Sequence, residues 1–277
     1  MIEIKTMPWA LILSVLMIYS CASEDVINEE EIPAEVLTSL QNAGYEVSDV
    51  LKSYEDDGTF NGYIVENDIL ITRESLEDLK EHKEIPSLEQ YATDNLVTGL
   101  PRVITVFMPN SFGRTEQRAL NLAIRAYNRE NLRISFQRTN SSANADIVFS
   151  RLSRLDELLG VLGSAGFPTN SGDPFGSIRL SGVLQSSFGL DVGAIATIIG
   201  HEMGHCIGFR HTDFFDRSIS CGGNPVNEGD GDVGANLIPG TTSGADLEGN
   251  GSWMLACSDG STRRFTTDDR TALNFLY

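Results

Sequence analysis

Three of the four histidines in the 277-residue chain fall within residues 201–211, which read HEMGHCIGFRH. Residues 192–200 before this run are small or apolar and follow Asp191, a pattern that predicts a helix with Asp191 as its N-cap. Because His201 and His205 are four residues apart, their imidazoles project from one face of this helix. The spacing therefore predicts that both can reach one metal ion.

Gly208 comes three residues after His205, at a position where a residue of positive φ can end a helix with little steric strain. The turn expected there would bring His211 back to the same metal ion. Three neutral imidazoles are a typical ligand set for catalytic zinc, because they leave a fourth tetrahedral position for water. The sequence thus predicts an open zinc site formed by His201, His205 and His211.

Glu202 lies next to the first predicted ligand but is rotated by about 100° around the helix. It therefore need not bind the metal and can face the water molecule instead. A carboxylate in this position can take a proton as water attacks a carbonyl and return it to the leaving amine. We predict metal-assisted peptide hydrolysis with Glu202 as the catalytic general base and acid.

The run resembles the metzincin signature H-E-x-x-H-x-x-G-x-x-H, and its longer form HEMGHCIGFRHTD resembles the bacterial dual-action HEIGH metallopeptidases. The resemblance covers residues 99–277. It implies an α+β, metzincin-like catalytic domain with a twisted mixed sheet, a backing helix, an active-site helix and a loop-rich lower subdomain. Metzincins also carry a methionine in a tight turn beneath the zinc ligands, and Met254 is the candidate for this Met-turn. A plain core methionine is the alternative, and Ala256 stands where some metzincins have a tyrosine.

Several segments of this half have the patterns of the expected elements. Apolar residues at 120, 123, 124 and 127 predict a helix over residues 115–128 that packs one face on a sheet. Strands are predicted at residues 103–108, 132–137, 146–150 and 177–180, and a last helix at residues 267–277, opened by Thr266 or Thr267. By analogy with metzincins, residues 162–168 would be an edge strand that binds substrate in an antiparallel manner. A flexible surface loop is the alternative there.

Residues 22–98 form a different kind of segment, because residues 22–95 hold 20 acidic and four basic side chains of a chain with net charge −19. After an acidic tether, a helix at 33–41, a hairpin made of 63–65 and 69–71, and a helix from 72 or 73 to 83 predict a small α+β domain. It is either a propeptide that blocks the active site or a permanent adaptor. No cysteine lies between Cys21 and Cys206, so a blocking ligand would be a carboxylate such as Asp56, Asp57 or Asp94.

Residues 1–21 resemble a bacterial export signal. The apolar run from residue 8 to 19 is too short to span a bilayer and suits a secretory signal peptide. It ends at Cys21 in a pattern that resembles a lipobox, which implies lipidation of Cys21 and anchoring to a membrane. An ordinary signal peptide is the alternative. We expect an exported protein, either an outer-membrane or cell-surface lipoprotein, or a periplasmic or secreted one.

The remaining cysteines are Cys206, Cys221 and Cys257, an odd number for an oxidising compartment. We expect one disulfide, with Cys221–Cys257 preferred and Cys206–Cys221 as the competitor.

Residues 222–251 are rich in Gly, Asn and Asp. The carboxylates of Asp230, Asp232 and Asp246 would suit calcium but follow no recognised loop spacing, so a long lip over the cleft is the alternative. Arg210 and Asp213, which flank His211, are expected to form an ion pair or to orient His211.

Together these features predict a secreted or surface-anchored zinc endopeptidase that acts on protein or peptide substrates. The net charge of −19 excludes nucleic acid as an expected partner. Two alternatives are a non-catalytic surface protein that holds zinc for binding or adhesion, and a zinc hydrolase of a non-peptide bond. Substrate specificity is not predicted from the sequence.

Overall fold

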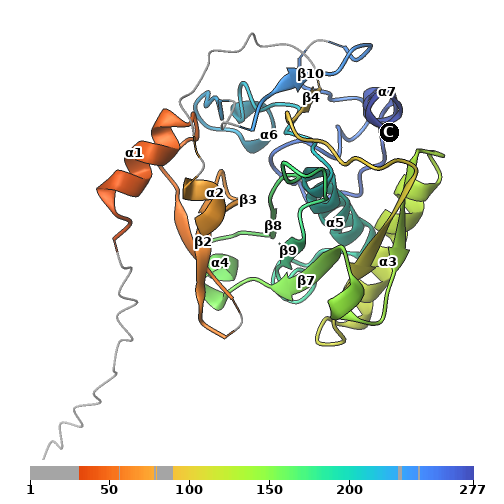
Figure 1. The fold of residues 1–277 in the computed structure, drawn as a ribbon, viewed down its shortest axis with the longest axis horizontal. Helices are drawn as coiled ribbons and strands as arrows, with labels where there is room; N and C mark the ends of the chain where they lie inside the picture. Colours follow the sequence, from red (N-terminus) through yellow and green to blue (C-terminus); the bar gives the residue numbers. More distant parts are fainter. Residues whose placement is uncertain (1–30, 56, 78, 80–89, 230–232, 243) are drawn as a thin grey trace, which may run out of the picture. The chain divides into compact units, whose positions relative to one another are not determined.

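The computed structural model describes residues 31–55, 57–77, 79, 90–229, 233–242 and 244–277, and residues 32–277 form one compact unit (Figure 1). The architecture is α+β, as predicted. The predicted boundary between residues 98 and 99 falls inside this unit. The leader, its Cys21, and the candidates Asp56, Asp230 and Asp232 lie outside the residues that the structure describes.

The centre of the unit is a mixed sheet of eight strands in the order β1-β2-β3-β8-β9-β7-β5-β6. The strands of the C-terminal half lie close to the predicted positions, because their alternating apolar residues face the core. Strands β5, β6, β7 and β9 run parallel, whereas β8 pairs with β9 in the antiparallel sense. Their bounds are β5 Arg102–Phe107, β6 Ile134–Arg138, β7 Ile147–Arg151, β8 Gly163–Ala165 and β9 Ser177–Leu180.

Two long helices pack together against this sheet. Helix α3, Arg114–Asn128, buries Leu120, Ala123, Ile124 and Tyr127, which confirms the predicted apolar face. Helix α5, Val192–Cys206, begins at Asp191, whose carboxylate accepts a hydrogen bond from the Ala194 N–H at 2.8 Å. The other elements of this half are α4 Arg154–Leu158, α6 Ser218–Cys221, α7 Thr267–Leu276 and the short pair β4 Tyr91–Ala92 and β10 Asn236–Leu237.

The N-terminal segment contributes three strands to the same sheet. Its elements are α1 Ala34–Asn42, β1 Leu51–Tyr54, β2 Phe60–Val65, β3 Ile69–Thr72 and α2 Arg73–Glu77. The predicted hairpin is confirmed as β2 and β3, and Figure 1 shows it beside β8.

The prediction that residues 162–168 form an edge strand is wrong, because β8 lies between β3 and β9. Strand β3 pairs with β8 in the parallel sense, and the Ala165 N–H donates to the Asp68 carbonyl at 3.0 Å. Sequence spacing within the C-terminal half could not reveal this pairing, since its partner comes from about 100 residues earlier in the chain. The N-terminal hairpin thus occupies the strand edge at which substrate binding was predicted.

Cys221 and Cys257 form a disulfide, which confirms the preferred pairing. Cys206 is free and buried on α5. Within the described part of the chain, no helix combines the length and apolar character needed to cross a membrane.

Candidate active site

The three predicted zinc ligands converge in the structure. His201 and His205 project from the last turns of α5, and their Nε2 atoms are 3.0 Å apart. Gly208, two residues after the helix ends, has φ +102°, and the chain turns there to bring His211 Nε2 to 3.3 Å from His201 Nε2. A side chain at Gly208 would be strained by this φ, and its Cβ would lie 2.8 Å from Leu96.

Each histidine is held by a hydrogen bond from its other ring nitrogen. Nδ1 of His201 donates to the Trp253 carbonyl and Nδ1 of His205 to the Phe209 carbonyl, both at 2.8 Å. Nδ1 of His211 donates to the Glu228 carboxylate at 2.8 and 2.9 Å. In the neutral form with the proton on Nδ1, each histidine presents the lone pair of its Nε2 to the shared centre.

Three converging lone pairs repel one another unless a cation lies among them, so this donor set fits a metal ion. Nitrogen ligands at roughly 2.0–2.1 Å from a tetrahedral zinc ion lie about 3.3 Å apart, close to the two Nε2 separations given above. All three rings are buried. His201, His205 and His211 would therefore hold zinc through their Nε2 atoms.

A fourth potential ligand comes from the N-terminal hairpin. Asp68 Oδ2 lies 2.9 Å from His211 Nε2, 3.3 Å from His201 Nε2 and 3.9 Å from His205 Nε2. With the three histidines it forms a group whose ligand atoms all lie within 4.8 Å of one another. A carboxylate of the same chain therefore lies where an open position was predicted, and no pattern in the sequence pointed to this residue.

The turn that carries Asp68 is locally strained. Glu66 and Asn67, the two residues between β2 and Asp68, have φ values of +56° and +68°. Glu66 is 2% exposed, and its carboxylate forms a second possible group of metal ligands with the imidazole of His211 and the carboxylate of Glu228. The strain is concentrated where the hairpin enters the histidine cluster.

The electrostatics of the cluster follow from its burial. Burial alone would raise the pKa of Asp68, but His211 and hydrogen bonds with the three histidines hold that pKa well below its usual range. Burial would likewise lower the pKa of His211, yet Asp68 and Glu228 raise it well above the usual value. Burial lowers the pKa of His205 to about 4. The anions around His211 thus favour a cation at the centre.

Glu202 is 2% exposed and lies beside the histidines on α5. A Cβ added at Gly163 would meet its Oε1 at 2.3 Å, so strand β8 approaches this carboxylate as closely as glycine allows. Its Oε2 has no hydrogen-bond partner among the described residues. Burial, and then the charge of Asp68, raise the pKa of Glu202 well above its usual value. The carboxylate has a free oxygen close to the predicted metal position.

Met254 is fully buried in the turn that supports the site. Its carbonyl accepts a hydrogen bond from the Thr212 N–H at 2.9 Å, next to His211. The preceding carbonyl, of Trp253, is the one that orients His201. The turn around Met254 therefore contacts the backbone next to His211 and carries the carbonyl that orients His201.

Glu228, and not the expected Arg210 or Asp213, orients His211. Its side chain is fully buried, and Arg217 Nε lies 3.1 Å from Oε1 of the same carboxylate. Arg210 donates to the Gly229 and Gly234 carbonyls, while Asp213 accepts from the Ala256 N–H at 2.8 Å. No motif spacing relates Glu228 to the histidines, so no local pattern pointed to it.

The calcium prediction gains no support at Asp246. Its carboxylate accepts hydrogen bonds from Thr266 Oγ1 and from the Glu248 N–H. Among the described residues, Asp246 belongs to no group of three potential metal ligands. Of the other predicted blocking carboxylates, Asp57 is exposed and Asp94 accepts from Asn236, so neither reaches the histidines.

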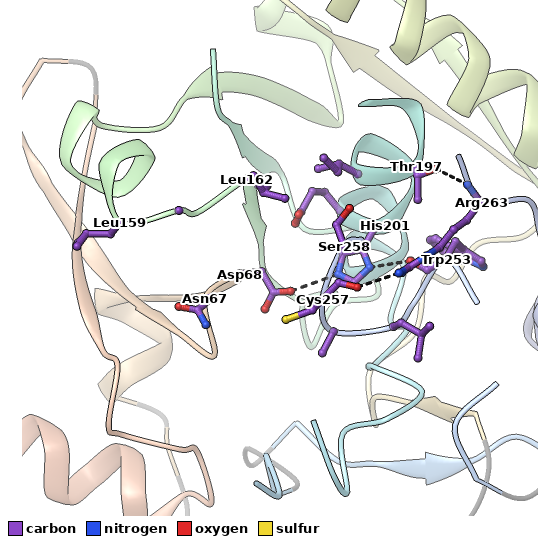
Figure 2. Close-up of a pocket in the computed structure, with 16 residues that line it drawn as sticks. Asn67, Asp68, Leu159, Leu162, Thr197, His201, Trp253, Cys257, Ser258 and Arg263 are labelled. Carbon is purple, nitrogen blue, oxygen red and sulfur yellow. Dashed lines mark hydrogen bonds and ion pairs between the residues drawn. The ribbon is translucent and has the colours of Figure 1, made fainter. Parts of the chain in front are cut away.

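A cavity of about 270 Å³ opens beside the cluster, lined by Asp68, His201 and Glu202 and by residues that follow Met254. Figure 2 shows Asp68 facing His201 across this space, with Trp253 on the other side of the imidazole. A buried three-histidine site with an adjacent carboxylate and a cavity is the arrangement of a metal-dependent hydrolase.

The family of dual-action HEIGH metallo-peptidases matches residues 63–277. The chain belongs to this family of zinc metallopeptidases. The match begins within β2 and so includes Asp68. No curated protein matches the chain.

Two solved structures are similar to it at low identity. Myroilysin is 14% identical, over 66% of this chain and 82% of that one, with a TM-score of 0.41. High choriolytic enzyme 1 is a hatching enzyme zinc-protease from the medaka fish Oryzias latipes. It is 17% identical, over 63% of this chain and 88% of that one, with a TM-score of 0.32. At TM-scores below 0.5, neither structure bears on the chemistry of the site.

Proposed function

We propose that this metallopeptidase is a zinc endopeptidase in which Glu202 is the general base and acid. The observation that carries the proposal is the convergence of three Nε2 lone pairs beside a carboxylate with an unpartnered oxygen. When bound, zinc supplies a Lewis acid that polarises a peptide carbonyl and lowers the pKa of a water molecule. His201, His205 and His211 hold the metal, and their Nδ1 hydrogen bonds fix the ring orientations.

Glu202 moves the proton in this mechanism. Its free carboxylate oxygen accepts a proton from the attacking water and returns it to the leaving amine. Gly163 lets β8 lie against the other oxygen, which limits the carboxylate to one orientation. The buried surroundings exclude bulk water and strengthen the electrostatic interactions there.

We further propose that the full chain is latent because Asp68 fills the position that the substrate and water need. Two features of the hairpin support this: the carboxylate lies 2.9 Å from His211, and β3 covers the backbone of β8. Displacement or proteolytic removal of the hairpin would open both the metal and the strand edge. Residues 22–98 then act as a propeptide-like domain rather than an adaptor.

A permanent role for Asp68 would favour the alternative of a non-catalytic zinc protein. Zinc sites with four protein ligands are typically structural, whereas catalytic sites keep one position open. Glu202 argues for catalysis, since a binding module gains nothing from a base beside the metal. A zinc hydrolase of a non-peptide bond would use the same residues, and only the substrate distinguishes it.

The deciding experiment uses the full chain with Asp68→Ala, alone and combined with Glu202→Ala, at equal zinc content. A mixed peptide library is incubated with each protein, and the products are identified by mass spectrometry. We expect cleavage by the single variant and none by the double variant. If neither protein cuts any peptide although both hold one zinc ion, the endopeptidase proposal is wrong.

The proposed location is outside the cytoplasm, with Cys21 as a lipid anchor. The leader sequence supports export, and so does the Cys221–Cys257 disulfide, because such bonds persist in oxidising compartments. Metabolic labelling with a radioactive fatty acid in a bacterial host tests the anchor. Label should enter the wild type but not Cys21→Ser, and equal labelling of both would contradict the proposal.

A further inference from the structure

Arg263 lines the cavity beside Glu202, and the proposed reaction does not use its charge. Leu162, Ile198 and Leu255 supply apolar parts of the cavity wall. Figure 2 shows Arg263 on the side of the cavity opposite Leu159, with its guanidinium group directed towards Cys257. At about 270 Å³ the cavity is smaller than a typical small-molecule site and suits one amino-acid side chain.

The guanidinium group of Arg263 is buried but not fully paired. Its side chain is 5% exposed, and Nη2 donates to the Cys257 carbonyl at 3.0 Å. The carboxylate of Asp259 lies 3.4 Å from Nη2, but that side chain is 57% exposed and so holds the arginine weakly. The Nε–H has no hydrogen-bond partner among the described residues. A buried cation with an unused donor favours an additional anionic partner.

The position of Arg263 is fixed by the active-site helix. Its backbone N–H donates to Thr197 Oγ1 at 2.9 Å, one turn before His201 on α5. The other charged or metal-binding groups that line the cavity are Asp68, His201 and Glu202, all of which belong to the metal site. Among the described lining residues, Arg263 is therefore the cation available to a substrate side chain.

The direction of the strands indicates which substrate residue would enter the cavity. Asp68, which occupies the substrate's place at the metal, bonds through its carbonyl to Ala165, whereas the cavity lies beside Leu162 and Gly163. Once the hairpin of β2 and β3 has left β8, a substrate antiparallel to β8 would run from the level of Ala165 towards Leu162. The side chain just after the scissile bond then lies next to the cavity.

We propose that Arg263 makes this cavity a subsite for an acidic side chain, Asp or Glu, on the substrate residue that follows the scissile bond. The carboxylate would accept a charge-assisted hydrogen bond from the guanidinium group. The apolar walls would contact the methylene groups of the side chain and keep water from the ion pair. This inference rests on the proposed endopeptidase function and names the substrate class of the same site.

The test uses the full chain with Asp68→Ala and three peptides that differ only after the scissile bond, where they carry Glu, Gln or Leu. We expect kcat/KM to be at least about tenfold higher for Glu than for Gln, as is typical of a hydrogen bond to a charged group. Each ratio comes from one enzyme preparation, so the fraction of active protein cancels. A ratio near one would overturn the proposal without affecting the peptidase function.

Variants then assign the preference to Arg263. In the Asp68→Ala background, Arg263→Gln should remove the preference for Glu and Arg263→Lys should keep part of it. Arg264→Gln is the matched control, because Arg264 is exposed and does not line this cavity. An unchanged ratio in a folded Arg263→Gln protein would contradict the assignment.

A binding measurement separates this inference from the catalytic proposal. Zinc-loaded Asp68→Ala/Glu202→Ala protein is titrated with labelled product peptides that begin with Glu or Gln. Tighter binding of the Glu peptide, lost with Arg263→Gln, would support the subsite even if no peptide is cleaved. Equal binding of both peptides would refute it.

Discussion

Replacing Asp68 by alanine in the full chain should convert a latent protein into an active peptidase. Asp68 is 7% exposed, and its carboxylate lies 2.9 Å from His211 and 3.3 Å from His201. Removing one partner of a buried ion pair typically destabilises the conformation that contains the pair by about 3–5 kcal/mol. Here that conformation is the closed one, in which the hairpin lies on the histidines. The lower figure applies here, since burial of the carboxylate opposes its charged form. At about 1.4 kcal/mol for each factor of ten, the open population should rise roughly 10²-fold.

The open population of the Asp68→Ala variant should stay below that of a protein without the hairpin, because β3 still pairs with β8 in this variant. Initial rates on a quenched fluorescent peptide, at equal zinc content, measure the effect. Intact mass confirms that the N-terminal segment is still attached. Asp57→Ala is the matched control, since Asp57 belongs to the same acidic segment but is exposed and accepts a hydrogen bond from the nearby Thr59 N–H. Equal rates for wild type, Asp57→Ala and Asp68→Ala would refute the latency argument.

Three further predictions concern the supports of the site. Glu228→Gln should weaken zinc affinity about 10–100-fold, because the neutral amide orients His211 less firmly. Competition with a chelator measures the affinity, and an unchanged value would contradict the role assigned to Glu228. Gly163→Ala should displace Glu202 and lower kcat while zinc content stays constant, whereas an unchanged kcat would show that the contact is not restrictive. The pKa of Asp269 is raised from 3.8 to about 6, with burial as the main cause, so the folded state binds this proton more tightly than the unfolded state does. The protonated Asp269 carboxyl therefore stabilises the folded state below about pH 4, and this stabilisation is lost as the pH rises through 6. The free energy of unfolding falls by about 3 kcal/mol over this range. Urea unfolding should show wild type losing about that much relative to Asp269→Asn between pH 4 and 7, and parallel curves would argue against it.

Local patterns in the sequence were sufficient to predict most of the long helices and strands of the C-terminal half. The spacing of Leu120, Ala123, Ile124 and Tyr127 predicted the buried face of α3, because a helix repeats every 3.6 residues whatever it packs against. Asp191 predicted the start of α5 for an equally local reason, since an N-cap bonds within its own first turn. The hairpin of β2 and β3 was also predictable, but its neighbour in the sheet was not.

Local sequence spacing was enough to predict the metal ligands and the chemistry proposed for them. A four-residue spacing on a helix, followed by a glycine turn, is enough to bring His201, His205 and His211 together. The residues that close and support this site come together through tertiary contacts instead. Asp68 and Glu228 reach the histidines from 133 residues before His201 and 17 residues after His211, respectively. Such contacts depend on strand pairing and loop packing across the whole unit, and no local repeat in the chain encodes them.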